Sequence, residues 1–369
     1  MLCGNAGVND NTHFACARGA RRMTMALRLL AGFLVALGGA LLALELNLPL
    51  PWMLGALLAT AGMRIAGARI ACALPLRNAG QWVIGTSLGL YFTPQVLEHI
   101  GRNAPAIVVG MVFAVGLAVM GTFMLLKLAR VDFRTAWFSS AIGGASEMAT
   151  LGERHGARVD LVATAHSLRI LLVVVAVPFF FRWSGISGTD PTVPGPREVH
   201  LWGLAVLVAT TCVAGSLFRR WRLPNPWVLG PMAVAILFTS NQVELSALPD
   251  VMVRGGQLLI GWSLGDRYRP GFFRSAPRFL GCVALFTTTS LALAICLSWG
   301  LSRISSVPLA TLILGTTPGG IAEMAITAKA LQLGVPVVTA FHVMRMVFVL
   351  MVTGPVYHWL APRFSRGEA

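Results

Sequence analysis

The chain has 369 residues, of which 56% are hydrophobic and only 12% are charged, and its mean hydropathy is +0.73. Soluble globular domains carry about a quarter charged residues, so this composition excludes a soluble enzyme and indicates that lipid surrounds most of the surface. The formal net charge is +15, but the Lys and Arg residues lie almost entirely in short gaps between apolar runs, which indicates control of membrane topology and argues against nucleic-acid binding.

The chain begins with a polar stretch, residues 1–24. It predicts a disordered cytoplasmic leader, or sequence upstream of a start at Met23 or Met25. A cleaved signal peptide is the alternative, because an apolar run follows Arg28. We favour an uncleaved first span, since no Ala-x-Ala-like cleavage site follows the run and the second half of the chain has a matching segment.

Two sets of six apolar elements follow, and each element is a predicted helix. The first set covers residues 26–46, 52–68, 78–92, 104–127, 135–152 and 159–182, and the second covers 199–218, 226–242, 255–266, 277–300, 308–328 and 335–360. Many are near the 20 or so residues that cross about 30 Å of hydrocarbon, but the second and third of each set are shorter. The predicted organisation is a leader at 1–24, a first membrane repeat at 25–182, a Gly- and Pro-rich linker at 183–198, a second repeat at 199–360 and a cytoplasmic tail at 361–369.

The two sets are copies of one unit, because five motifs recur at an offset of 175–176 residues. The motif pairs are Leu48 to Gly55 with Leu223 to Gly230, Gly80-Gln81 to Gly89 with Gly256-Gln257 to Gly265, Pro94 with Pro270, Gly143-Gly144-x-x-Glu147-Met148 with Gly319-Gly320-x-x-Glu323-Met324, and His166-x-x-Arg169 with His342-x-x-Arg345. Constant spacing across five separate motifs is very hard to obtain by chance, so we infer a duplication.

The basic residues of the loops indicate how the two copies are oriented. We compared each of four successive loops with its counterpart in the other copy. The loop with more Lys and Arg belongs alternately to the second copy and to the first. If all twelve elements cross, these residues divide almost evenly between the two sides of the membrane. If the fifth element of each copy instead enters and leaves by one side, most of them are cytoplasmic, as the positive-inside rule requires. The predicted fold class is therefore an all-α polytopic membrane protein with two inverted-topology repeats, about ten transmembrane helices, two re-entrant or broken helices and both termini cytoplasmic.

The fifth element of each copy carries an acidic residue behind a backbone break. It contains Gly143-Gly144 and Glu147 in the first copy, and Gly319-Gly320 and Glu323 in the second. Paired glycines permit unusual backbone angles, and a membrane tolerates such a break only where the freed polar groups face protein or a water-filled cavity. A Glu one turn beyond the break can accept a proton, bind a cation or orient a basic group. A packing kink with a structural ion pair is the alternative.

The sixth element of each copy places a His and an Arg inside the membrane. His166 and Arg169 share one helix face at i and i+3, as do His342 and Arg345. An Arg near the bilayer centre costs about 2.5–3.5 kcal/mol on insertion scales and must find a partner. The nearest candidate partners in sequence are the two glutamates of the fifth elements. A neutral ion-paired site is one outcome, and an anion-binding Arg beside a titratable His and Glu is the other.

Other motifs are structural or undecided. Trp52 and Trp227 suit an interfacial belt, so the Pro-Trp motif predicts a membrane anchor. Gln81 and Gln257 lie on short helices rich in small residues, which pack closely or line a cavity. The six cysteines form no CxxC pair, and no nucleotide-binding, nucleophile or HExxH motif occurs, so we expect no enzyme activity, catalytic residue, metal or cofactor.

The twin Pro-Trp-x-Leu-Gly and Gly-Gly-x-x-Glu-Met motifs, in a duplicated chain of this length, resemble the AbrB family of bacterial membrane proteins over residues 26–360. This family, known for the AbrB duplication, is unrelated to the soluble DNA-binding regulator of the same name. Its members have been labelled regulators of gene expression and also ammonia monooxygenases, but a copper monooxygenase would need a metal-ligand cluster that the sequence does not show. The family is similar to duplicated cation–proton antiporters and anion transporters, a likeness of fold that does not establish a substrate.

We therefore expect a multi-pass carrier of the bacterial inner membrane that moves an unknown small solute, an organic anion among the options, with proton or sodium coupling. The expected binding residues are Gly143, Gly144, Glu147, His166, Arg169, Gly319, Gly320, Glu323, His342 and Arg345. The alternative function is a membrane-embedded sensor that influences gene expression without transport, and a membrane enzyme ranks last. The lipid bilayer and the solute are the expected partners, nucleic acid is not, and a homo-oligomer stays open.

Overall fold

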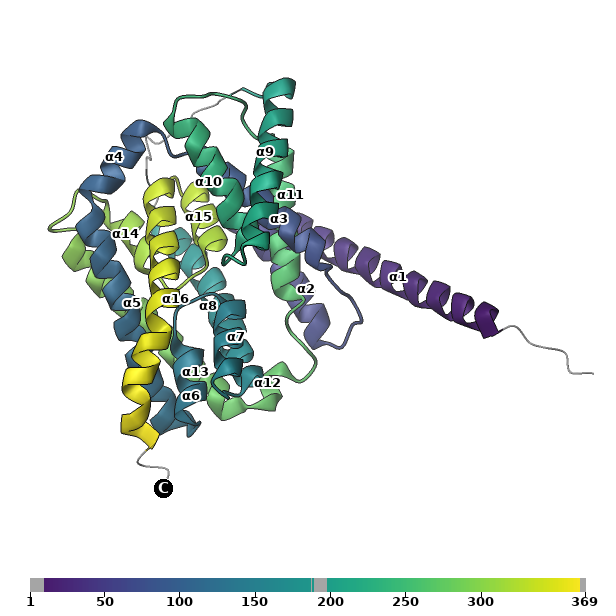
Figure 1. Ribbon diagram of the computed structural model, residues 1–369, viewed down its shortest axis with the longest axis horizontal. Coiled ribbons are helices and arrows are strands. Elements are labelled where there is room, and N and C mark those ends of the chain that lie inside the picture. Colours follow the sequence, from purple (N-terminus) through teal and green to yellow (C-terminus); the bar gives the residue numbers. More distant parts are fainter. Residues whose placement is uncertain (1–9, 187, 189–197, 366–369) are drawn as a thin grey trace, which may run out of the picture.

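The computed structural model describes residues 10–186, 188 and 198–365, and within them all regular structure is helical (Figure 1). The first half contains α1 (Asp10–Glu45), the π-helix η1 (Pro51–Gly55), α2 (Ala56–Ile65), α3 (Leu74–Gly89), α4 (Pro94–Arg102), α5 (Ala104–Met124), the π-helix η2 (Leu125–Ala129), α6 (Phe133–Ser140), α7 (Ala145–Arg154) and α8 (Val159–Ser184). The second half contains α9 (Leu201–Arg220), α10 (Pro226–Ser240), α11 (Asp250–Gly265), α12 (Phe272–Ser275), α13 (Pro277–Leu301), α14 (Leu309–Thr316), α15 (Ile321–Ala330) and α16 (Val335–Ser365).

The second half repeats the element order of the first. Helices α9, α10 and α11 follow the order of α1, η1–α2 and α3, and helices α12 to α16 follow that of α4 to α8. Both halves also contain a short helix, α4 or α12, between the third and fourth apolar elements. The apolar pattern did not predict these two helices, because α4 mixes polar and apolar residues over only nine positions and α12 has only four residues.

Among the described residues, six helices are long and apolar enough to cross a membrane. They are Met25–Glu45, Ala104–Ala129, Val159–Ser184, Leu201–Arg220, Pro277–Leu301 and Val335–Pro362. The second and third elements of each copy are shorter: α3 and α11 have 16 residues each, α10 has 15 and α2 has 10. A 16-residue helix rises only about 24 Å. The fold is thus that of an all-helical membrane protein, whereas the predicted count of ten spans is not established by helix length.

Helices extend past two of the predicted boundaries. Helix α1 begins at Asp10, so residues 10–24 of the predicted disordered leader are helical, and α16 continues to Ser365, inside the predicted tail. Propagation of an already formed apolar helix costs little, and the Ala and Arg residues before Met25 favour helix. Residues 1–9, and most of the predicted linker at 183–198, lie outside the described residues.

Glycines let helices of the two halves approach backbone to backbone. A Cβ added to Gly85 on α3 would overlap the Val228 carbonyl oxygen on α10. A Cβ added to the counterpart Gly261 on α11 would overlap the carbonyl oxygen of Met53, and Met53 is itself the counterpart of Val228. The same contact is therefore made twice with the halves exchanged. We call η1, α2, α3, α10 and α11 the glycine-packed bundle, in which small residues permit close helix packing.

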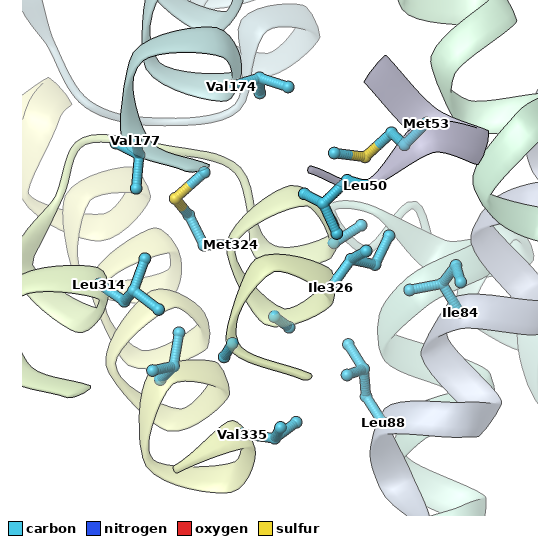
Figure 2. Close-up of a cluster of buried hydrophobic side chains, with 14 of the residues drawn as sticks. Leu50, Met53, Ile84, Leu88, Val174, Val177, Leu314, Met324, Ile326 and Val335 are labelled. Carbon is cyan, nitrogen blue, oxygen red and sulfur yellow. The ribbon is translucent and has the colours of Figure 1, made fainter. Parts of the chain in front are cut away.

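A large buried apolar cluster joins this bundle to the second broken element (Figure 2). Leu50 and Leu88 contribute from the first half, and Met324, Ile326 and Val335 contribute from α15 and α16. Because lipid tails are as apolar as these side chains, such a cluster is stabilised within a membrane mainly by van der Waals packing. A second buried cluster, with Trp137, Phe138 and Met148, packs against the first broken element.

Candidate functional site

Both fifth elements break at their paired glycines, as predicted. Helix α6 ends at Ser140 and α7 begins at Ala145, while α14 ends at Thr316 and α15 begins at Ile321. Each break leaves the carbonyl groups at the end of one half-helix, and the N–H groups at the start of the next, without helical partners. The rest of the site is organised around these free backbone groups.

The two glutamates fold back over the starts of their half-helices. Glu147 and Glu323 lie in the first turns of α7 and α15, where a negative charge is favoured by the helix dipole. A Cβ added to Gly144 would overlap the Glu147 carboxylate, and one added to Gly320 would overlap that of Glu323. A side chain at the second glycine of each pair would therefore displace the glutamate carboxylate from this position.

In the first copy, the His and Arg of α8 bind the end of α6. His166 accepts and donates at once: its Nε2 lies 2.9 Å from the Phe138 carbonyl oxygen, and its Nδ1 lies 2.8 Å from Arg169 Nη2. Because a carbonyl oxygen only accepts and a guanidinium only donates, this geometry requires a neutral imidazole protonated at Nε2. Arg169 Nη1 donates to the Ala141 carbonyl oxygen at 3.2 Å.

In the second copy, the equivalent side chains of α16 bind the end of α14 more closely. His342 Nε2 lies 3.0 Å from the Leu314 carbonyl oxygen. Arg345 donates to the carbonyl oxygens of Thr317 at 2.6 Å and Gly319 at 2.5 Å. Both arginines are almost fully buried, at 4% exposed for Arg169 and 6% for Arg345. In each copy, a fixed positive charge therefore sits at the negative end of a half-helix.

These contacts correct the expected pairing of the arginines. Within the described residues, no ion pair of 4.0 Å or less joins Arg169 or Arg345 to Glu147 or Glu323. Carbonyl oxygens exposed by the breaks take the place of the carboxylates, because the half-helix ends lie closer to α8 and α16 than the glutamates do. The alternative of a titratable His beside the Arg stays a prediction; both ring nitrogens of His166 are within hydrogen-bond distance of partners in this structure.

The two breaks meet at a cavity of about 100 Å³, which we call the central cavity. Seven of the ten predicted site residues line it: Gly143, Gly144, Glu147, Arg169, Gly319, Gly320 and Glu323. The other three, His166, His342 and Arg345, are not among its lining residues and hold the half-helix ends behind its wall. The structure thus brings both broken elements to one place, as predicted.

Sequence reasoning missed two basic residues of this cavity. Arg77 and Arg267 line it, although we interpreted both as loop charges that control topology. Gln81 also lines it, whereas its counterpart Gln257 does not. A signal was present for Arg77, because it lies four residues before Gln81 and so shares one face of α3. Nothing in the sequence distinguishes Arg267 from the other arginines of its loop.

A second cavity of about 680 Å³ adjoins the first, and we call it the vestibule. The two cavities share four lining residues: Arg77, Ala145, Ser146 and Arg267. The vestibule continues past Ala149, the first turns of α8 at Val159 and Asp160, and the residues before α12. The central cavity is therefore approached from the side of the molecule that carries α7 and α12.

Five equivalent positions on the other side of the central cavity are buried. The counterparts of the vestibule residues Arg77, Ser146, Ala149, Val159 and Arg267 are Val253, Ala322, Ala325, Val335 and Tyr91. All five belong to the buried cluster of Figure 2, and none is more than 7% exposed. We call these five residues the apolar seal. At these five positions the vestibule side is hollow and carries two arginines, whereas the matching side is buried and apolar.

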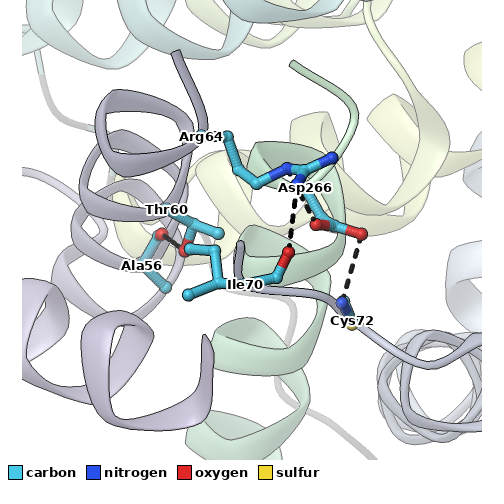
Figure 3. A network of polar contacts seen from close by, with 6 residues as sticks. All are labelled: Ala56, Thr60, Arg64, Ile70, Cys72 and Asp266. Carbon is cyan, nitrogen blue, oxygen red and sulfur yellow. Dashed lines mark hydrogen bonds and ion pairs between the residues drawn. The ribbon is translucent and has the colours of Figure 1, made fainter. Parts of the chain in front are cut away.

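A polar network holds the chain segments beside Arg267 (Figure 3). Asp266 forms an ion pair with Arg64 at 3.3 Å and accepts a hydrogen bond from the Cys72 backbone N–H at 3.1 Å. Arg64 also donates to the Ile70 carbonyl oxygen at 3.1 Å. Burial, with the Asp266 carboxylate as a smaller contribution, raises the pKa of the Cys72 thiol to about 12. The network ties the α2–α3 loop of the first copy to the end of α11 in the second.

A metal site is not part of this arrangement in the described portion of the chain, where no three His, Cys, Asp or Glu side chains gather so that they could hold a metal ion. The fold and the charged central cavity together define a helical membrane protein with a polar site between two broken elements.

The chain belongs to the AbrB family. The family model described as "Transition state regulatory protein AbrB" matches residues 52–361, which confirms the resemblance carried by the twin motifs. The chain is 25% identical over 319 residues to "Putative regulator AbrB" of Escherichia coli (strain K12), covering 85% of this chain and 90% of that protein. It is 25% identical over 358 residues to "Uncharacterized protein YhjN" of Bacillus subtilis (strain 168), covering 88% and 91%. No solved structure matches the chain significantly.

Proposed function

We propose that this protein is a secondary transporter of the bacterial inner membrane, which moves a small solute through the central cavity with proton or sodium coupling. In this proposal the solute binds between the two breaks, at the residues that line the cavity from both halves. An organic anion suits a site with this many arginines. The proposal goes beyond the family membership and beyond the names of the two relatives.

The orientation of the two halves is part of the proposal. We infer ten crossing helices and two broken elements, with the second repeat inverted relative to the first. Two observations support this: the loop charges, and the positions of equivalent elements in Figure 1, where α4 lies at the top of the view and α12 near the bottom, and α15 lies above α7. Inverted repeats with discontinuous helices at the membrane midplane are typical of secondary transporters.

The observation that carries the proposal is the difference between the two approaches to one central site. The vestibule reaches the central cavity from one side, and the apolar seal closes the other. Because both approaches are built from equivalent residues of two similar units, an exchange of conformations between the units would open the second approach and close the first. A carrier that alternates in this way needs one site and two gates.

An uptake assay tests the proposal. The purified full-length protein is reconstituted in proteoliposomes, and internal pH and membrane potential are followed while metabolite mixtures are added outside. We expect solute-dependent flux that falls at least about tenfold in Glu147→Gln and Glu323→Gln. Glu153→Gln is the matched control, because Glu153 lies on the same helix as Glu147 but is exposed and lines neither cavity.

Two outcomes would count against transport at this site. Unchanged flux in both glutamine variants would discard the site. Ligand binding without any flux, together with a stable soluble partner recovered with the wild-type protein, would instead support the sensor function.

A further inference from the structure

The central cavity is lined by more arginines than carboxylates, with three of the first and two of the second. Arg77 and Arg267 line it together with Glu147 and Glu323. Within the described residues, neither Arg77 nor Arg267 forms an ion pair of 4.0 Å or less. Two guanidinium groups therefore face a cavity in the membrane protein without a fixed carboxylate bound to them.

A third arginine adds an independent indication of a ligand. Arg169 is 4% exposed and lines the same cavity, and its Nε has no hydrogen-bond partner in the described part of the chain. Its Nη groups bind His166 and the Ala141 carbonyl oxygen, so the positive charge lies at the C-terminal end of α6. The starts of α7 and α15 also border the cavity, with the Glu147 and Glu323 carboxylates folded back over them.

These groups favour a carboxylate as ligand. The guanidinium fork matches the two oxygens of a carboxylate, and hydrogen bonds between charged partners are the strong ones. A cavity of about 100 Å³ has room for a carboxylate with a few attached atoms, since one water takes about 30 Å³ in the liquid. A longer ligand could extend into the vestibule, which Arg77 and Arg267 also line.

The two glutamates determine what must accompany the anion. Three arginines, Arg77, Arg169 and Arg267, line the cavity against two glutamates, so the site has an excess of positive charge that admits a carboxylate. The bound carboxylate is then the third carboxylate around a cavity of about 100 Å³, and repulsion between like charges this close favours protonation of a glutamate. A proton taken up from vestibule water by a glutamate carboxylate removes this repulsion, giving a neutral carboxyl group. His166 cannot take this proton without placing an N–H against Arg169.

Sodium is a poorer fit as the accompanying ion. In carriers with broken helices, sodium is bound by the carbonyl oxygens of unwound segments and half-helix ends. Here Arg169 and Arg345 already donate to those carbonyl oxygens, at Ala141, Thr317 and Gly319. A fixed guanidinium occupies the place where a metal cation would bind in each copy.

We propose that the central cavity binds a small carboxylate between Arg77 and Arg267 together with one proton on Glu147 or Glu323, which makes the carrier a proton–carboxylate symporter. This inference rests on the proposed transport function for its last step, but the coupled binding of anion and proton is a property of the site alone. The remaining charged groups near the site, Asp160 and Arg269, line the vestibule and not the central cavity.

Calorimetry tests the coupled binding on the purified full-length protein in lipid nanodiscs. The probes are the choline salts of acetate, lactate and succinate, with choline chloride and sodium chloride as controls, each titrated at pH 6 and pH 8 in two buffers of different ionisation enthalpy. We expect at least one carboxylate to bind, about tenfold more tightly at pH 6, with uptake of up to one proton per anion and no requirement for sodium.

Substitutions identify the side chains that bind the anion and the side chain that accepts the proton. Arg77→Gln and Arg267→Gln should each weaken carboxylate binding at least about tenfold, while Arg254→Gln, an exposed position on α11, should leave it unchanged. A glutamine at the proton-accepting glutamate should retain binding but remove its pH dependence, because the neutral amide resembles the protonated carboxyl group. Thermal melting of each variant without ligand checks that it is folded.

The outcomes separate the inference from the transport function. Absence of binding by every carboxylate at both pH values, binding without proton uptake, or binding that requires sodium would overturn the inference. Flux that is independent of pH would overturn it while leaving transport intact. Proton-coupled binding with no flux in proteoliposomes would leave the site intact and overturn transport.

Discussion

Five positions in the wall of the vestibule can be compared with their counterparts in the apolar seal. On the vestibule side, four of them lie in the first copy and Arg267 lies in the second; they include two arginines and a serine and border a cavity of about 680 Å³. In the seal, Val253, Ala322, Ala325 and Val335 lie in the second copy and Tyr91 lies in the first, and all five are buried in one apolar cluster. Two copies with the same order of helices can therefore carry different residues at the approaches to the site.

The glycine-packed bundle shows the opposite behaviour. There the contacts of one copy are repeated by the other, with Gly85 against Val228 and Gly261 against Met53. Helices α3 and α11 show both behaviours, because their packing glycines keep equivalent contacts while Arg77 on α3 is replaced by Val253 on α11. The difference between the two approaches is therefore local to the positions that border them.

The largest expected effect is a loss of stability when either of the two buried arginines is replaced. Arg345→Met should lower the free energy of unfolding by at least about 3 kcal/mol, because two hydrogen bonds from a charged donor are lost and each is worth about 1.5–3 kcal/mol. Arg169→Met should cost less, since its bond to Ala141 is longer and its other bond goes to a side chain. Denaturant titration in detergent measures both. A larger loss for Arg169→Met would contradict the asymmetry.

A medium effect tests the equivalence of the bundle. Gly85→Ala and Gly261→Ala each place a methyl group against a backbone carbonyl oxygen, and overpacking of this kind costs about 1–3 kcal/mol. The two losses should be similar, as measured by thermal melting in the same detergent. Gly62→Ala is the control, because a Cβ there meets nothing within 4 Å and Ala favours helix. Unequal losses at Gly85 and Gly261 would show that the bundle has also diverged.

The smallest effect concerns the polar network beside Arg267. With the pKa of the Cys72 thiol raised to about 12, little thiolate exists at pH 8, so labelling by a maleimide should be slow in a variant with Cys72 as its single cysteine. Asp266→Asn removes a negative charge that disfavours the thiolate, so the pKa should fall and the labelling rate at pH 8 should rise. Labelling of the folded protein as fast as of the denatured protein would refute this.

Much of the site could be predicted from spacing alone. The paired glycines located both breaks, and the i, i+3 spacing put each His and Arg on one helix face, because these are local properties of the backbone. The partners of Arg169 and Arg345 could not be predicted in this way. Which carbonyl oxygens lie within reach depends on how α8 and α16 cross the half-helix ends, and sequence proximity pointed to the glutamates instead.

The same limit applies to Arg77, Arg267 and the seal. An arginine at the end of a short helix looks like a loop charge until the fold shows that its side chain borders a cavity. The counterpart pairs of vestibule and seal were present in the sequence, for example Ser146 with Ala322, but their meaning depends on knowing that both positions face one central site.

Cysteine accessibility tests the two-gate arrangement most directly. Ala163 borders the vestibule and is exposed, whereas its counterpart Thr339 is fully buried. In a cysteine-free background, Ala163→Cys and Thr339→Cys are labelled with a membrane-impermeant maleimide from each side of sealed vesicles. We predict that Ala163→Cys reacts only from the cytoplasmic side. Thr339→Cys should react only from the opposite side, and only while the protein is transporting solute. Reaction of both from one side, or of Thr339→Cys at the same rate with and without turnover, would contradict the account.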